Sequence, residues 1–398
     1  MKLLHIADLH IGKVVNGFPM IDDQRHALEQ VLRIADERRI DALLIAGDVY
    51  DKTAPSAEAI SLVDWLLTAV GKRGIACFVI PGNHDSAERI AYGGGLMEDR
   101  GVHMAPLYDG AVRKVTLEDR HGPVDFWLLP FLKPALVRPF FPDEDIGSDY
   151  NSALRAALGA CGIDPARRNV LIAHQFVTAG GDEPARSDSE VVVGGLENVD
   201  AGLFDGFDYV ALGHIHRPQR IGRDEVRYAG SLLKYSASEV DHPKSAALVE
   251  LGGKDGPGGC EVRIELEPIE PLHDMRRIKG RLSQLTDPDV VSQADPDDYL
   301  HVTLTDGKPI IDALAKLRAV YPNVMSLAYE SAGGSVEAGP VEGGKIEDLD
   351  PLDLFERFYE ERNDEKLDDA SRRIVEEALR EQMADPDATG SEDGEELL

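Results

Sequence analysis

The sequence predicts an α/β protein in which mixed β-sheets are flanked by helices and followed by a small α+β unit and C-terminal helices. Two observations lead to this prediction. Along the first half of the chain, short apolar segments alternate with segments whose apolar residues recur at helical spacing, as in sheets covered by helices on both faces. Several apolar segments also end in Asp, Asn or His, at the strand ends where open α/β sheets carry their functional sites.

The first half is expected to contain strands and helices in turn. The first strand is apolar at residues 3–6, and a helical pattern follows around residues 28–35. A second strand at 42–46 precedes a helix around 60–70. The further strands expected are 75–80, 170–173 and 209–212, with a hairpin of 245–251 and 261–268 around a Gly-rich loop at 252–259.

A smaller unit begins near residue 271, with strands expected at 299–304 and 324–329 and a helix at 310–320. The segment after it is rich in Gly, Ser and Glu, which predicts a linker, and two amphipathic segments then precede an acidic, disordered tail. The predicted divisions are a main domain 1–270, a small domain 271–330, a linker 331–350, a helical segment 351–384 and a tail 385–398.

The charge and composition restrict the class of protein. The net charge is −31 over 398 residues, and residues 342–398 hold 21 Asp and Glu against 7 Lys and Arg, which leaves −17 on the rest. Proteins that bind phosphates unaided usually carry a basic face, so we expect metals or a partner to supply part of the positive field. No apolar run approaches the roughly 18 residues of a membrane span. Three cysteines stand singly, as is usual in a reducing cytoplasm.

Polar residues that can bind metals close five of the predicted strands. They are Asp8 and His10; Asp48, with Asp51 three residues on; Asn83, His84 and Asp85; His174; and His214 and His216. Carboxylate, imidazole and amide ligands without thiolate suit Mn, Fe, Zn or Mg rather than a structural zinc. Two such ions about 3.5–4 Å apart can hold a phosphoryl group and activate water.

The residues suggest how two ions would be shared. Asp48 follows a glycine and is the natural carboxylate to bridge both ions. Asp8 and His10 are two apart on one strand, so both are expected to face one ion, and the same holds for His214 and His216. An Asp-x-His or Gly-Asp pair alone is more often structural. The Gly-Asn-His-Asp and Gly-His-Ile-His pieces are more specific, because polar and small residues there serve no packing purpose. The other seven histidines fit no piece of this pattern.

The order D-x-H, G-D-x-x-D, G-N-H-D, H, G-H-x-H resembles that of the calcineurin-like metallophosphoesterases, whose fold is a sandwich of mixed β-sheets flanked by helices. Within them the chain is similar to nuclease subunits of the SbcD type. The stretches that carry the resemblance are MKLLHIADLHIGK, IAGDVYDKTAPS, VIPGNHDS, AHQFVTAGG, DYVALGHIHRPQ and VRYAGSLLKYSASE. The protein phosphatases of the superfamily, with GDxxDRG and GNHE, fit less well, because Lys52 follows Asp51 and Asp85 follows His84.

The resemblance implies a role for each site residue. One metal would be held by Asp8, His10, Asp48 and His216, and the other by Asp48, Asn83, His174 and His214. His84 would contact the scissile phosphate and protonate or stabilise the leaving oxygen, with Asp51 or Asp85 orienting its ring. The two ions would be manganese. Residues 271–330 would form a capping domain that positions DNA, and the basic residues 276, 277, 279 and 281 could contact phosphates or form a solvated face.

The function implied by the resemblance is that of a cytoplasmic, nucleoid-associated DNA nuclease in repair, recombination and replication. It would be a 3′-5′ exonuclease on duplex ends and an endonuclease at hairpins and single strands. Its partner would be an SbcC-type ABC ATPase bound through residues 351–384, with a homodimer of this chain inside a heterotetramer. Two alternatives stay open: a small-molecule phosphodiesterase or protein phosphatase on the same fold, and a scaffold without activity.

Overall fold

The structure is a computed structural model that describes residues 1–180, 183–188, 190, 198–254 and 259–330, with isolated residues at 352, 355, 359, 368, 371–373, 375 and 376. The predicted linker 331–350 and tail 385–398 lie outside the described residues, as does most of the predicted helical segment 351–384. None of the helices in the described part of the chain has both the length and the apolar character that crossing a bilayer requires.

The first sheet has six strands in the order β16-β15-β1-β4-β5-β6. Four of these are mutually parallel, and β15 runs antiparallel to β1 and to β16. The N-terminal strand therefore lies in the interior of its sheet, next to a strand made more than two hundred residues later. The bounds are β1 Lys2–Ile6, β4 Ala42–Ala46, β5 Ala76–Ile80, β6 Val102–Met104, β15 Ser245–Leu251 and β16 Val262–Pro268.

The second sheet also has six strands, in the order β13-β14-β12-β9-β8-β7. Its inner strands β14, β12, β9 and β8 are parallel, and both edge strands are antiparallel to their neighbours. The bounds are β7 Arg113–Asp119, β8 Gly122–Leu128, β9 Arg168–His174, β12 Tyr209–Gly213, β13 Gln219–Ile221 and β14 Arg223–Tyr228. Two short ribbons accompany the sheets, β2 Val14–Val15 with β3 Phe18–Pro19, and β10 Val177–Thr178 with β11 Val199–Asp200.

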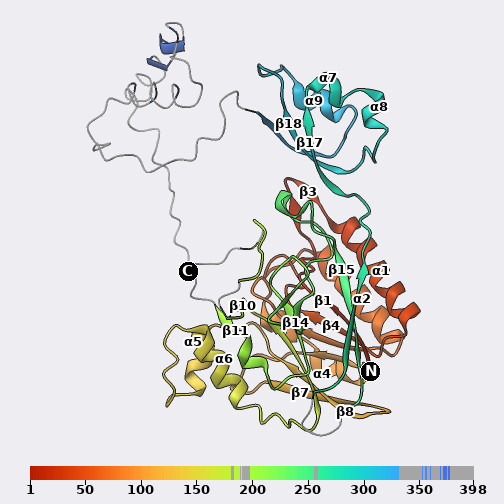
Figure 1. Ribbon diagram of the computed structural model, residues 1–398, viewed down its shortest axis with the longest axis vertical. Coiled ribbons are helices and arrows are strands. Elements are labelled where there is room, and N and C mark those ends of the chain that lie inside the picture. The colour runs from red at the N-terminus through yellow and green to blue at the C-terminus, as the bar shows by residue number, and fades with distance from the viewer. Residues whose placement is uncertain are drawn as a thin grey trace, which may run out of the picture.

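The two sheets pack face to face, and helices cover their outer faces (Figure 1). Between the sheets the rings of Phe78 and Phe126 stack at 4.3 Å between centroids, within a fully buried apolar layer. Helices α1 and α2 share a second core with the first sheet, and α6 shares a third with the second sheet. The predicted α/β sandwich of mixed sheets flanked by helices is thereby confirmed. The helices are α1 Ile21–Arg38, α2 Ala57–Lys72, α3 Ala87–Ala91, α4 Gly94–Met97, α5 Pro134–Val137 and α6 Tyr150–Gly159.

Beyond residue 271 the chain forms a small unit with its own apolar core, built on the parallel sheet β17-β18-β19. The predicted strands are present, but the helix expected at 310–320 is shorter, because its N-cap Asp312 has a left-handed backbone with φ 57°. The bounds are β17 Met275–Gly280, α7 Leu282–Leu285, α8 Pro288–Val291, β18 Tyr299–Leu304, α9 Ala313–Arg318 and β19 Val324–Tyr329.

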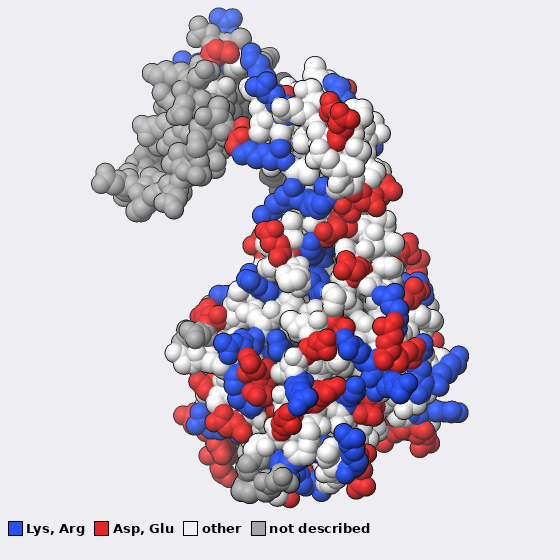
Figure 2. All heavy atoms as spheres, turned by 45° about the vertical axis from the view of Figure 1, so that its right-hand side comes forward, with Lys and Arg blue, Asp and Glu red and all other residues white. Residues whose placement is uncertain are grey.

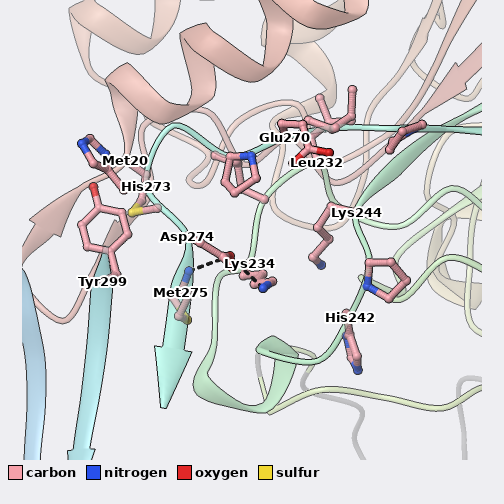
Figure 3. A pocket seen from close by; sticks show the side chains of 15 residues that line it. Met20, Leu232, Lys234, His242, Lys244, Glu270, His273, Asp274, Met275 and Tyr299 are labelled. Carbon is pink, nitrogen blue, oxygen red and sulfur yellow. Dashed lines mark hydrogen bonds and ion pairs between the residues drawn. The ribbon is translucent and has the colours of Figure 1, made fainter. Parts of the chain in front are cut away.

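Polar contacts join the small unit to the sandwich. On α1, the carboxylate of Asp23 accepts hydrogen bonds from the main-chain N–H of His273 and from the hydroxyl of Tyr299, at 3.1 and 2.9 Å. The ammonium of Lys234 pairs with Asp274 at 2.7 Å. Figure 3 shows this junction, where a cavity of about 230 Å³ lies between the two parts and is also lined by Lys244.

Candidate metal centre

The site residues predicted from the sequence come together at one end of the sandwich. Strands β1, β4 and β5 of the first sheet and β9 and β12 of the second carry them at or just beyond their carboxyl ends. The two sheets meet here directly, because the main-chain N–H of His214 donates to Asp8 Oδ1 at 2.8 Å across 206 residues of sequence. The site is therefore built from both sheets.

Four of the candidate ligands have a backbone conformation that L-residues seldom adopt. The φ angles are 52° at Asp8, 45° at His10, 48° at Asp48 and 102° at His214. Such positions cost of the order of 1–3 kcal/mol each and persist only where the surroundings enforce them. Here the N–H groups of Asp8 and His10 donate to the carbonyls of Gly47 and Asp48, at 3.1 and 2.9 Å. The strained loops hold one another in place.

The glycines that precede the polar residues allow the strand ends to approach closely. A Cβ added at Gly213 would lie 1.9 Å from the carbonyl oxygen of Ala46, and one at Gly82 would lie 2.2 Å from Asp48 Oδ1. Neither obstacle is the flexible end of a long side chain, so no other residue fits without displacing the site. This explains why Gly stands before Asn83 and before His214.

The first group of candidate ligands contains Asp8, His10 and His216, whose ligand atoms all lie within 4.8 Å of one another. The Nε2 atoms of His10 and His216 are 3.1 Å apart. His10 Nε2 is also 3.6 Å from Asp48 Oδ2. All four side chains are buried.

The second group brings Asn83, His174 and His214 to the same Asp48. Asn83 Oδ1 is 3.0 Å from both His174 Nε2 and His214 Nδ1, and Asp48 Oδ2 is 3.3 Å from His174 Nε2. One oxygen of Asp48 thus faces both groups. His214 and His216 reach different groups, unlike the common face expected of a strand, because β12 ends at Gly213 and the backbone of His214 is left-handed.

The hydrogen bonding of this cluster fits divalent cations. His174 Nδ1 lies 2.8 Å from the Ala46 carbonyl, so it carries a ring proton, and Nε2 is the atom that faces the oxygens of Asn83 and Asp48. Asp8 Oδ2 and His214 Nε2 are buried with no hydrogen-bond partner. A single proton can bridge only one pair of these facing acceptor atoms. A metal cation in each of the two ligand groups can instead bind all the acceptor atoms of that group at once. Unpaired buried polar atoms are costly, and metal coordination removes that cost.

The pKa values of three residues in this cluster are also shifted by burial and by neighbouring charges. Burial disfavours the charged form of both Asp8 and His214, and it raises the pKa of Asp8 to about 6 and lowers the pKa of His214 to about 3. Burial also lowers the pKa of His174, but the neighbouring Asp48 carboxylate outweighs it and raises that pKa to about 9. The cluster therefore mixes protonated and unprotonated ligands, and divalent ions would displace those protons.

The three residues predicted to act on the substrate have distinct environments. His84 is half-buried, and its Nδ1 lies 3.1 Å from the main-chain carbonyl of Asp51, not from a carboxylate. The Asp51 side chain instead pairs with Lys13 at 2.8 Å and lies 3.7 Å from His10 Nδ1. Asp85 is buried, and its two oxygens accept N–H bonds from residues 49, 50 and 82 at 2.8–3.0 Å. Its contacts fix the loops rather than the His84 ring.

Two buried residues near the ligands were not predicted from the sequence. Gln24 on α1 donates to the carbonyls of Leu9 and His10, at 3.3 and 2.8 Å. Glu239 is fully buried, and its Oε1 is 3.1 Å from His216 Nδ1. The only sequence signal for Glu239 is its place at the end of the stretch VRYAGSLLKYSASE, which does not by itself identify a contact with His216.

Solved structures to which the chain is similar include a dimetal phosphatase from Danio rerio and the phosphoesterase Yfce from E. coli. The first is 13% identical and matches 66% of this chain and 98% of its own, with a TM-score of 0.38. The second is 14% identical and matches 68% of this chain and 100% of its own, with a TM-score of 0.27.

Two family models match the chain in separate regions. A model described as type 5 capsule protein repressor C-terminal domain, SbcD_C, matches residues 271–363. The model of the calcineurin-like phosphoesterases matches residues 1–218, which is more than half of the sequence and includes every predicted site residue. The resemblance seen in the motifs is confirmed, and the chain belongs to the calcineurin-like phosphoesterase family as a metallophosphoesterase of the SbcD type.

Proposed function

We propose that this protein is a two-metal DNA nuclease that hydrolyses phosphodiester bonds, with manganese as its metal. The observation that carries the proposal is the position of Asp48, whose Oδ2 faces His10 of one ligand group at 3.6 Å and His174 of the other at 3.3 Å. A shared carboxylate is what a pair of ions about 3.5–4 Å apart requires. The ligand groups are Asp8, His10, Asp48 and His216, and Asp48, Asn83, His174 and His214.

The metal ions and the residues around them would have different roles in the reaction. Bound metal ions would supply a nucleophilic water and neutralise charge on the phosphate. His84 Nδ1 faces a carbonyl oxygen, which can only accept, so Nδ1 keeps its proton and Nε2 is the atom that exchanges a proton with the leaving oxygen. The main-chain N–H of His84 donates to Asp48 Oδ1 at 2.9 Å, which ties the catalytic ring to the bridging carboxylate.

The presence of the small unit favours a long polymeric substrate over a small-molecule substrate. The β2–β3 ribbon, which follows His10 in the chain, packs on this unit, with the Phe18 and Tyr299 rings 5.8 Å apart. A second folded body therefore flanks the metal centre, as suits a substrate that extends beyond one phosphate. The match of residues 271–363 to the SbcD_C model favours DNA, and we infer that the small unit is the capping domain of a main domain ending near residue 270.

The surface charge is consistent with a requirement for metal ions in DNA binding. Lys and Arg alternate with Asp and Glu over most of the face in Figure 2. Of the basic residues on and next to β17, Arg276 pairs with Asp298 at 2.6 Å and Lys279 with Glu330 at 2.5 Å, while Arg277 is exposed. Phosphate binding would therefore depend on the ions more than on a basic surface.

We also infer two protein partners. The SbcD_C match supports an SbcC-type ABC ATPase bound through residues 351–384, in a nucleoid-associated complex that acts in repair, recombination and replication. A homodimer is supported by an apolar groove of about 450 Å³ beside α2, next to which Tyr92 and Leu96 are 83% and 85% exposed. Apolar side chains that project beside a hollow on the same surface suit a self-complementary contact between two copies.

The proposal is tested by incubating the purified chain with a hairpin-ended DNA duplex and Mn²⁺, Mg²⁺ or EDTA, with and without the ATPase. We expect endonucleolytic opening of the hairpin and 3′-5′ degradation with Mn²⁺, and no cleavage in EDTA. Hydrolysis of a small phosphodiester with intact DNA would favour the small-molecule alternative. Binding of DNA with no hydrolysis of either substrate would favour a scaffold.

A further inference from the structure

A buried ion pair lies directly behind the first ligand group. Glu239, at the end of a short 3-10 turn Ala237–Glu239, has no exposed surface. Its Oε1 lies 3.1 Å from His216 Nδ1, and its Oε2 lies 2.6 Å from the ammonium of Lys244. One oxygen of this carboxylate therefore faces a candidate metal ligand, and the other faces a buried cation.

All three N–H groups of the Lys244 ammonium donate hydrogen bonds to neighbouring acceptors. Besides Glu239 it donates to the hydroxyl of Ser231 at 2.8 Å and to the main-chain carbonyl of His216 at 3.0 Å. Three donors meet three acceptors, so this cation has no proton left for a substrate. The pair instead contacts His216 twice, through Glu239 at the ring and through Lys244 at the backbone.

The energetics of burial argue against a purely stabilising role. Charges taken out of water lose hydration, and a buried pair often contributes no more stability than apolar side chains of similar volume. What a carboxylate offers here is a fixed acceptor for a ring N–H. With the proton held at Nδ1, the lone pair of His216 lies on Nε2, which faces His10 Nε2 at 3.1 Å. Carboxylates behind histidine ligands fix the ring and its tautomer in this way.

We propose that Glu239 and Lys244 are positioning residues that hold His216 as the Nδ1–H tautomer and thereby set the affinity of one of the two metal ions. This inference rests on the proposed metal site. Lys244 neutralises Glu239, so the pair orients the ring without adding a net charge beside the ions. Lys244 also connects the Glu239–Lys244 pair to the junction between the sandwich and the small unit. Its main-chain carbonyl accepts a hydrogen bond from the N–H of Ile269, and its side chain lines the cavity in Figure 3.

Two double variants separate positioning from packing. Glu239→Leu with Lys244→Leu removes the acceptor and leaves no unpaired charge, so the fold should survive. Glu239→Gln with Lys244→Met also removes both charges, but its amide oxygen still accepts from His216 Nδ1. The control is Asp208→Asn. It breaks another buried ion pair, between Asp208 and Lys254 at 3.0 Å, which lies at the end of the sandwich strands opposite the metal ligands.

The first measurement is calorimetric titration of the metal-free proteins with Mn²⁺. The wild type should bind two ions, and the Leu/Leu variant should bind one of them about 10–100-fold more weakly, the usual effect of losing a contact behind a ligand. The Gln/Met variant should recover most of that loss, and Asp208→Asn should match the wild type. Unchanged affinity in the Leu/Leu variant, or equal losses in both double variants, would overturn the proposal.

The second measurement is made without metal. In ¹⁵N-histidine spectra of the metal-free wild type, the signal that disappears in His216→Gln should show the Nδ1–H tautomer, and the Leu/Leu variant should show the Nε2–H form or a mixture. An Nδ1–H signal that persists in the Leu/Leu variant contradicts the inference. Failure of the wild type to bind two ions or to hydrolyse phosphodiesters would instead refute the proposed function, which the tautomer measurement does not depend on.

Discussion

The replacement of His84 by Gln separates catalysis from metal binding. Among the described residues, the His84 ring makes one polar contact, to the Asp51 carbonyl at 3.1 Å, and one edge contact to the His10 ring at 4.8 Å between centroids. Losing them should cost about 1–2 kcal/mol of folding stability. The main-chain hydrogen bond from His84 to Asp48 is kept in the variant. The metal ligands should therefore stay in place.

The expected loss of rate is much larger than the loss of stability. Glutamine cannot carry a titrating proton at the position of Nε2, and a positioned acid is worth about 10²–10⁴ in rate, or roughly 3–5.5 kcal/mol of barrier. Single-turnover cleavage of a labelled duplex measures the chemical step without interference from product release. Elemental analysis of the same samples gives the metal content.

The matched variant is Asp48→Asn, which alters the oxygen that faces both ligand groups. It should lose metal and activity together, whereas His84→Gln keeps about two ions and cleaves slowly. A His84→Gln protein with only one ion would mean that His84 is a ligand and that its assigned role is mistaken. Full rate with both ions would mean that the ring is only structural.

Three further outcomes follow from described contacts and from the predicted segments. Asp51→Asn should slow cleavage less than His84→Gln does, because the main-chain carbonyl that orients His84 remains; equal losses in parallel assays would contradict this. Arg168→Met should lower the free energy of unfolding by about 1–3 kcal/mol, measured by urea denaturation, because it removes the hydrogen bonds from Arg168 to Asp119 and to the carbonyls of Gly122 and Gly252, while activity per folded molecule stays unchanged. Deleting residues 346–398 should abolish co-purification with the ATPase and leave a folded, metal-binding chain; early melting of the truncated protein would instead assign these residues to the core.

The strand ends could be predicted because their signal is local. An apolar run that stops at Gly followed by Asp, Asn or His shows both the element and its chemistry in five to eight residues. The predicted strands that correspond to β4, β5 and β12 agree with the structure for this reason. Which strands pair could not be predicted in the same way. The contact of β1 with β15 joins Leu3 to Val249, and no periodicity in either segment specifies it.

The finer structure of the site depended on backbone geometry that residue types do not reveal. The separation of His214 and His216 follows from a left-handed backbone at a non-glycine residue, where strand alternation was the reasonable expectation. The family resemblance implied Asp51 or Asp85 as the residue that orients the His84 ring, yet the Asp85 oxygens accept hydrogen bonds from main-chain N–H groups across the site. Glu239 comes close to His216 only through the fold.

The position of β1 inside its sheet has a consequence for synthesis of the chain. Its partner β4 is made early, but its other edge stays uncovered until β15 leaves the ribosome, more than two hundred residues later. An exposed apolar strand edge invites pairing with other chains. The proposed ligand His216 is also translated late, so a nascent chain can gain the complete set of proposed metal ligands only shortly before β15 closes the sheet. A fragment that stops at residue 218, where the phosphoesterase match ends, would contain every proposed ligand but lack β15, and should aggregate rather than fold.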